Sequence, residues 1–593
     1  MFRRFFVGSL VFIAGAVVSC DSHLASAEQK FTAFESSTPI QQAPVMSPNL
    51  HAKARTSYLS EQARETLRLR ATLMKIRCQA PQKKQTLRLL QDEKPDLSFS
   101  VGNTSTGYLV GAKQLTQPSS LYRALPVQYE RDLGYATAEL IELIEDSAKT
   151  MHKLYPGTVL FLGNFAAAEG GDIPYSVSHN SGRDADIAFI FRRIDDNVAL
   201  FPQNFPKYGA SLRSNNILGY RFDSERNAAL VKTLITHPKH HVQFIFVAKH
   251  LRRAMRNALV NSKTDPDVLA RFDVVVQEQA AHADHMHIRV YCAKHEICAG
   301  CIDRSLIHEW HDDPVPIREA CVKKYSKILR NKKSSTQNLA AAIERLRLLE
   351  SLETERTRVL SLLAHDNKEV RRAAVESAPY LSEPSEALGK RFAAEQDDDM
   401  RCAVLQSLSI TRDETALSFL VDALKLPAFK CGAKSSYELS LAAIAFANNK
   451  KWVRPLITLR NSAETEHWQH FDRTLRMLTN QSAPNNDWNL WLDTQGEKPR
   501  KQWLIEGFNA AGYAVRTLGV QDIPNLLDAV MGEEHISRNA RRTLMQISGR
   551  NPPCLEWAAS DARWYFTRYF KRRYRKFKVD LSDRDERGIR LKK

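Results

Sequence analysis

At 593 residues, 43% of them hydrophobic and 26% charged, the chain is too long for one ordinary core and too apolar for a disordered polymer. We therefore expect two or three globular units. The formal charge of +18 favours polyanionic partners, such as nucleic acid, anionic lipid or anionic cell-wall polymer, without choosing among them.

The chain begins with a pattern typical of an export signal. Two arginines lie within residues 1–4, and an apolar run follows at 5–18. This run is short for a membrane span of about 20 residues, so a spanning helix is the less favoured alternative. Residues 1–27 are assigned as a signal peptide or lipoprotein signal, and the mature protein is expected in the periplasm.

Two routes of signal processing remain open. Residues 17–20 resemble a bacterial lipobox in which Cys20 becomes the lipidated first residue, whereas residues 25–27 fit ordinary cleavage before Glu28. The lipoprotein route is slightly favoured, and Asp21 at the second mature position resembles an inner-membrane retention signal. Export also makes disulfides the first interpretation of the other cysteines.

A tether and an α+β domain are predicted next. Residues 28–85 are poor in apolar periodicity and include a short basic helix around 61–77. Residues 86–330 alternate amphipathic helices with short β-rich runs, at 158–162, 187–191 and 242–247. This pattern indicates an α+β fold with a small antiparallel sheet and flanking helices.

Residues 335–578 are predicted to be an all-α domain of HEAT-like repeats. Residues 370–375 are echoed thirty positions later at 400–405, and the pattern of 475–488 recurs at 544–557. Such units bury their apolar faces by stacking on neighbours. An irregular helical bundle is the alternative.

The end of this helical half is basic and aromatic. From Arg563 to Lys578 there are eight Lys or Arg residues, no acid and seven aromatic residues. This alternation is typical of nucleic-acid grooves and of anionic membrane binding, and the alternative is a solvated final helix whose aromatic rings pack inward. Export disfavours nucleic acid, which leaves an anionic surface as the expected partner. Residues 579–593 are predicted to be a flexible tail.

Two segments of the α+β domain concentrate metal-ligand side chains. They contain His179, Asp184 and Asp186 in the first and His282, His285 and His287 in the second. Side chains two apart on an extended chain share a face, so His285 and His287 should point into one cleft. The turn at Gly182 can fold His179 back towards Asp186.

This set of side chains suits a catalytic zinc ion. Catalytic zinc takes three protein ligands and leaves a fourth position to water, a count that His179, Asp186 and His287 meet. His285 and His282 are then expected to act as general base and as hydrogen-bond donor to the oxyanion. The ligand types also admit manganese or iron, and structural histidines or a closed structural zinc site are the alternatives.

Together the two segments resemble the penicillin-insensitive murein endopeptidase family of the lysostaphin and D-alanyl-D-alanine metallopeptidase group. The similar residues lie at 178–187 and 282–290, with Gly102, 107–109, Gly111, 157–160, 170–171 and 242–246. The resemblance covers about residues 97–301 and none of the helical half. It implies one zinc ion and hydrolysis of peptidoglycan cross-links, of the D-alanyl–diaminopimelyl type.

The resemblance also implies roles for the site residues. In the family, the positions that match His179, Asp186 and His287 hold zinc. Those that match His282 and His285 lie in the active site. Judged from the residues alone, Asp184 could replace Asp186 as the third ligand. The family pattern favours Asp186.

One position departs from the family. Members usually carry a further His three positions before the first ligand, where this chain has Ser176. Because the three inferred ligands are intact, we expect an active enzyme whose substrate is peptidoglycan and whose repeats contact envelope proteins. The alternative is a non-catalytic envelope protein that binds stem peptides and uses the repeats as a scaffold.

Three cysteines follow the second segment. The spacing of Cys298 and Cys301 would fit a second zinc site, but export favours a disulfide-tied loop. The family resemblance also favours a bridge from Cys292 to Cys298 or Cys301. A bond between Cys78 and Cys321 is a weaker alternative.

Overall fold

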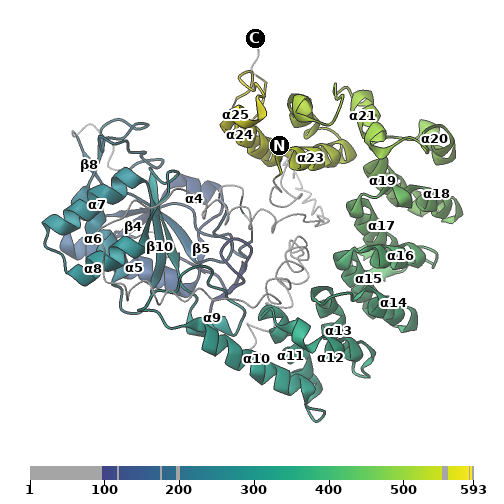
Figure 1. Ribbon diagram of the computed structural model, residues 1–593, viewed down its shortest axis with the longest axis horizontal. Helices are drawn as coiled ribbons and strands as arrows, with labels where there is room; N and C mark the ends of the chain where they lie inside the picture. Colours follow the sequence, from purple (N-terminus) through teal and green to yellow (C-terminus); the bar gives the residue numbers. More distant parts are fainter. Residues whose placement is uncertain are drawn as a thin grey trace, which may run out of the picture.

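The computed structural model describes residues 97–115, 119–171, 173, 176–194, 201–549, 559–585 and 588–590. The expected signal, the tether, Cys20 and Cys78 lie outside these residues. Within the described ranges, no helix is both long and apolar enough to cross a membrane. The chain folds into a half built on a sheet and a half built mainly from helices (Figure 1). The second half also holds one short antiparallel strand pair, β13 (Lys430–Cys431) with β14 (Lys434–Ser435).

A six-stranded sheet forms the middle of the first half. In spatial order its strands are β11 (Val276–Glu278), β10 (Val242–Val247), β12 (His285–Val290), β7 (Asp184–Ala188), β6 (Leu160–Leu162) and β4 (Tyr122–Ala124). The three inner pairs are antiparallel, whereas β10 with β11 and β4 with β6 are parallel. The expected α+β class is confirmed. The sheet is mixed rather than wholly antiparallel because helical crossovers join the parallel edge strands.

Helices, one hairpin and two further strand pairs surround the sheet. The helices are α4 (Pro126–Glu130), α5 (Ala138–Leu154), α6 (Ser224–Ile235), α7 (Lys249–Asn261), α8 (Pro266–Val275) and α9 (Lys294–Ile297). The hairpin is β1 (Phe99–Val101) with β2 (Tyr108–Val110), and the further pairs are β3 (Lys113–Gln114) with β5 (Tyr135–Ala136) and β8 (Phe191–Arg193) with β9 (Tyr220–Phe222). Helices α5, α6 and α8 start at side-chain caps. In α5 the Thr137 hydroxyl accepts a hydrogen bond from the N–H of Leu140.

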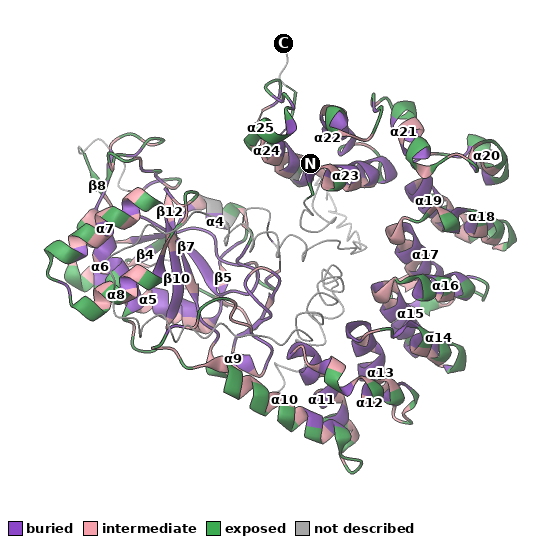
Figure 2. Ribbon diagram, in the orientation of Figure 1, coloured by how far each residue is buried: buried purple, intermediate pink, exposed green. Residues whose placement is uncertain are grey.

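Apolar and polar side chains alternate along the two central strands. Ala185 and Ile187 of β7, with Met286 and Ile288 of β12, enter the hydrophobic core. The intervening polar side chains share the opposite face, because successive side chains of a strand point to opposite sides. Both strands are buried over nearly their whole length (Figure 2).

The second half is a curved array of helices. They are α10 (Pro314–Arg330), α11 (Thr336–Leu348), α12 (Arg356–Ser361), α13 (Lys368–Ser377), α14 (Ser385–Ala394), α15 (Asp398–Thr411), α16 (Glu414–Ala423), α17 (Ser436–Ala447), α18 (Val453–Ser462), α19 (Trp468–Thr479), α20 (Trp488–Gln495), α21 (Arg500–Ala510), α22 (Ile523–Ala529), α23 (Glu534–Ser548), α24 (Ala559–Arg572) and α25 (Tyr574–Phe577). Helices α11, α13, α15, α17, α19 and α23 pack in sequence as an inner row (Figure 1). Stacking from α11 to α19 buries one continuous core, and α23 belongs to a second cluster that it shares with α22 and α24.

The internal echoes mark equivalent positions in this array. Residues 370–375 lie in α13 and residues 400–405 in α15, which are successive inner helices. In the second echo, α19 and α23 each end in a left-handed residue, Asn480 and Gly549, both with φ of 64°. A left-handed residue is a common way to end a helix.

Three disulfides are present among the described residues: Cys292–Cys301, Cys298–Cys321 and Cys402–Cys431. The first is one of the two expected bridges and is confirmed. The alternatives that join Cys298 to Cys292, or Cys321 to Cys78, are wrong. Helix α10 brings Cys321 to the end of α9, at a Cα–Cα distance of 5.8 Å from Cys298. The same bonds exclude a second zinc site, because thiolates are needed to hold the metal.

Candidate active site

The polar face of β7 and β12 carries most of the candidate site. Antiparallel pairing places His287 opposite Asp186 and Arg289 opposite Asp184. His285 lies on the same face, two residues before His287. Because both strands lie inside the sheet, neighbouring strands fix their backbones on both sides.

Three histidines converge on one carboxylate oxygen. Oδ1 of Asp186 lies 3.2 Å from Nδ1 of His287, 3.3 Å from Nε2 of His179 and 3.5 Å from Nε2 of His285. The ligand atoms of His179, Asp186 and His287 all lie within 4.8 Å of one another. All three residues are buried.

The same atoms lack hydrogen-bond partners. Within the described residues, neither Oδ1 of Asp186 nor either ring nitrogen of His179 has one. Buried polar atoms without partners are rare, and a shared cation would account for Oδ1 of Asp186 and for one ring nitrogen of His179. Two imidazoles and a carboxylate are a donor set that divalent transition metals accept. The residues therefore fit a metal ion.

A turn before β7 places His179 beside Asp186 and His287. His179 has φ of 80° and Gly182 has φ of 75°, so two residues of the loop before β7 adopt the left-handed backbone conformation. A positive φ is uncommon for a residue with a side chain and requires support from its surroundings. Here the N–H of His179 donates to Oδ2 of Asp184 at 3.0 Å, and the N–H of Asn180 donates to the carbonyl of Thr104 at 3.0 Å.

Two side chains orient the candidate ligands. Asn164 donates from Nδ2 to Oδ2 of Asp186 at 3.0 Å, which leaves Oδ1 facing the histidines. Asp184 accepts from Arg289 at 2.7 and 3.2 Å, and its Oδ1 lies 3.4 Å from Nε2 of His287. Asp184 therefore contacts the ring nitrogen of His287 that points away from Asp186. Such outer partners fix the orientation of ligating imidazoles.

His285 and His282 stand beside the candidate ligands. Nδ1 of His285 is 2.7 Å from Oδ1 of Asp284, so a proton held there leaves Nε2 as an acceptor. The ring of His282 is 5.0 Å from that of His285 and 5.5 Å from that of His287. Its Nδ1 is buried and has no partner among the described residues.

Burial and neighbouring charges set the protonation of these groups. Burial would raise the pKa of Asp186, but the surrounding imidazoles hold it well below its usual value. Burial lowers the pKa of His282 to about 3, and repulsion from the other histidines adds to this shift. Burial also disfavours charge on His287, but Asp184 and Asp186 raise its pKa to about 9. Asp186 therefore stays ionised, and the neighbouring His282 stays neutral.

Aromatic rings form the apolar wall of the site. The ring of Phe205 is 4.9 Å from that of His285, and the ring of Phe246 is 5.6 Å from that of His287. Gly163 makes room for this wall, since a Cβ atom there would lie 2.1 Å from the Phe205 ring. Low polarity around the site strengthens electrostatic interactions inside it.

The structure thus brings the five side chains named from the sequence into one cluster. It adds Asn164 and Asp284, to which the sequence assigned no role. Asp284 directly precedes His285, so its contact with that histidine could have been predicted from the sequence. Asn164 lies 22 residues before Asp186 and carries no signal in the sequence. Ser176, which replaces the family histidine, accepts from the N–H of Ser178 at 3.3 Å.

Comparison with known families finds one match in each half of the chain. Residues 100–339 match the family model of the penicillin-insensitive murein endopeptidases, and residues 356–429 match that of HEAT repeats. Both predicted families are confirmed. A comparison with curated proteins finds no match. The first match covers the sheet domain that carries the histidine cluster, and it likens that domain to the penicillin-insensitive murein endopeptidases.

Proposed function

We propose that this chain is a zinc-dependent murein endopeptidase that hydrolyses peptide cross-links of the D-alanyl–diaminopimelyl type. The convergence of His179 and His287 on Oδ1 of Asp186 carries the proposal. Three protein ligands of these types suit a catalytic zinc ion and leave one position for water. The family match supplies the peptidoglycan substrate.

Zinc in this site would polarise the scissile carbonyl and lower the pKa of a water molecule at its open position. His285 would accept a proton at Nε2, because Asp284 holds the other ring nitrogen in its protonated form. His282 is neutral and would donate a hydrogen bond to the oxyanion that forms on the carbonyl. Phe205 and Phe246 would limit the access of bulk water.

Digestion of purified cross-linked muropeptides, with mass spectrometry of the products, tests this function. We expect the zinc-loaded chain to release uncrosslinked peptides and His287→Ala to release none. The mass of the products identifies the bond that is cut. If the zinc-loaded chain binds muropeptides and cleaves none, the non-catalytic alternative is supported, and Ser176 is the residue that favours it.

We also propose that the chain is exported to the periplasm and is lipid-anchored at Cys20, with Asp21 favouring the inner membrane. The three disulfides support export, because such bonds persist in oxidising compartments. Metabolic labelling with a fatty acid tests the anchor. Label should enter the wild-type chain and not Cys20→Ser.

A third proposal concerns α24 and α25, which we expect to bind an anionic surface. Phe566, Phe570 and Phe577 are buried, so these aromatic rings pack inward and leave the cations outside. Among the described residues, none of the eight cations from 563 to 578 forms an ion pair. In contrast, cations of earlier helices pair with carboxylates, as Arg473 does with Glu534. A basic face whose cations contact carbonyls and aromatic rings, as Lys571 contacts the carbonyl of Arg584 and Arg568 contacts Trp564, keeps its net positive charge and favours a polyanion.

A further inference from the structure

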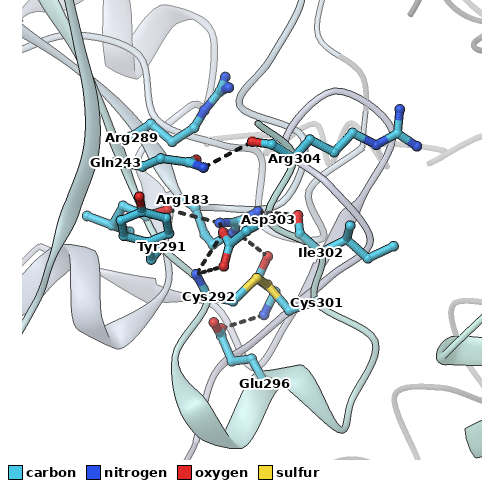
Figure 3. Close-up of polar contacts among 12 residues, drawn as sticks. Arg183, Gln243, Arg289, Tyr291, Cys292, Glu296, Cys301, Ile302, Asp303 and Arg304 are labelled. Carbon is cyan, nitrogen blue, oxygen red and sulfur yellow. Dashed lines mark hydrogen bonds and ion pairs between the residues drawn. A yellow bond between two sulfur atoms is a disulfide. The ribbon is translucent and has the colours of Figure 1, made fainter. Parts of the chain in front are cut away.

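Arg183 lies at the centre of a buried polar junction next to the candidate metal site (Figure 3). Its guanidinium donates to Oδ1 of Asp303 at 2.6 Å and to the carbonyls of Val290 at 2.9 Å and Ile302 at 3.0 Å. A fourth bond reaches the hydroxyl of Ser100 at 3.1 Å. The side chains of Arg183 and Asp303 are 1% and 0% exposed. The rigid fork of an arginine suits several acceptors at once.

The Cys292–Cys301 disulfide holds Asp303 in this junction. Cys292 follows β12 closely, and its N–H lies 3.1 Å from both carboxylate oxygens of Asp303. Cys301 lies two residues before Asp303, so the disulfide returns the chain to the end of β12. That strand carries His287. The junction therefore connects one end of a ligand-bearing strand to the start of the other, β7.

The helical array packs against the same loop. Leu348, at the end of α11, shares a hydrophobic cluster with Phe99 of β1 and Ala299 of the loop. A Cβ atom on Gly300 would lie 2.4 Å from the carbonyl oxygen of Leu348. The Cys298–Cys321 disulfide joins the loop to α10 covalently. The junction is thus enclosed by the sheet domain on one side and the first repeat on the other.

We propose that Arg183 and Asp303 position the metal-binding loop and so set the metal affinity of the site. This inference rests on the proposed zinc site. Arg183 lies between the Gly182 turn and the carboxylates of β7, and its carbonyl accepts from the N–H of Val290 at 3.0 Å. His179 keeps its positive φ only while the loop is fixed at both ends. Release of the guanidinium would let His179 relax away from Asp186.

Zinc affinity of the full chain, measured by competition with a chromogenic chelator, tests the inference. Asp303→Asn keeps the volume and one acceptor but removes the charge. We expect its zinc affinity to fall about tenfold, the lower end of the effects seen for residues that support metal ligands. Asp528→Asn is the matched control. Asp528 pairs with the buried Arg584 at 2.7 and 2.9 Å at the far end of the array, and its loss should leave zinc affinity unchanged.

A second comparison removes one of two disulfides and leaves Arg183 and Asp303 unsubstituted. The double variant Cys292→Ala with Cys301→Ala should also weaken zinc binding. Its control, Cys402→Ala with Cys431→Ala, removes a bond of the array and should not. Unchanged affinity in both junction variants overturns the inference, and so do equal losses in junction and control variants. If the wild-type chain itself binds no zinc, the proposed function fails instead.

Discussion

Replacing Asp186 with asparagine should abolish most zinc binding with little change of shape. Oδ2 of this carboxylate accepts from Nδ2 of Asn164 at 3.0 Å. In the variant, the amide oxygen must take that place, because an amide nitrogen there would face another donor. The new NH₂ group then points at the site where His179 and His287 converge. It cannot ligate a cation, so the variant loses a charged ligand.

The expected loss of stability follows from the linkage between zinc binding and folding. Loss of a supporting residue weakens metal binding about 10–100-fold, and loss of a ligand should reach at least about a hundredfold. At a free zinc concentration of about 100 times the wild-type Kd, binding stabilises the wild-type fold by about 2.7 kcal/mol. A hundredfold weaker variant gains only about 0.4 kcal/mol. For a domain of about 200 residues the difference is roughly 5–9 °C in Tm.

Thermal unfolding of the full chain with and without zinc measures this difference. Asp146→Asn is the control, since Asp146 pairs with Lys149 on the surface of α5 and lies outside the cluster. The control should keep the whole zinc-dependent shift in Tm. A full shift in Asp186→Asn would refute the assignment of this carboxylate as a ligand.

Three further predictions concern the base, the basic face and acid stability. His285→Ala should lower kcat by about 10²–10⁴-fold while zinc content measured by mass spectrometry stays the same, and loss of zinc would make His285 a ligand instead. Replacing Arg568, Lys571 and Arg572 with glutamine should weaken binding to anionic vesicles and reduce its salt dependence; binding that ignores salt would contradict the charge argument. Burial lowers the pKa of His311 to about 4 from its ordinary 6.5. Between these two pH values the folded state therefore binds fewer protons than the unfolded state. Stability should therefore fall as pH drops from about 6.5 to about 4, and His311→Phe, which keeps a ring stacked on Tyr291, should reduce this fall in urea midpoints.

The sequence alone identified the ligand-bearing segments because local rules govern them. The spacing of His285 and His287 placed both side chains on one face of a strand, and the structure has this pattern. The strand predicted at 187–191 begins earlier, at Asp184, and ends at Ala188. The turn at Gly182 was likewise readable from the residue itself. The helical half followed from its 3.6-residue periodicity and its echoes, which mark stacked neighbours.

Tertiary structure alone decided which distant groups meet. Nothing local to Asn164 indicates its bond to Asp186, and nothing local to Asp303 indicates Arg183, 120 residues earlier. The disulfide pairing could not be predicted for the same reason, because the packing of α10 against the loop places Cys321 beside Cys298. Periodicity reports which face of an element is buried, but not what packs against it. The partners are fixed by the order of strands in the sheet and by the docking of the first repeat, and both depend on the whole chain.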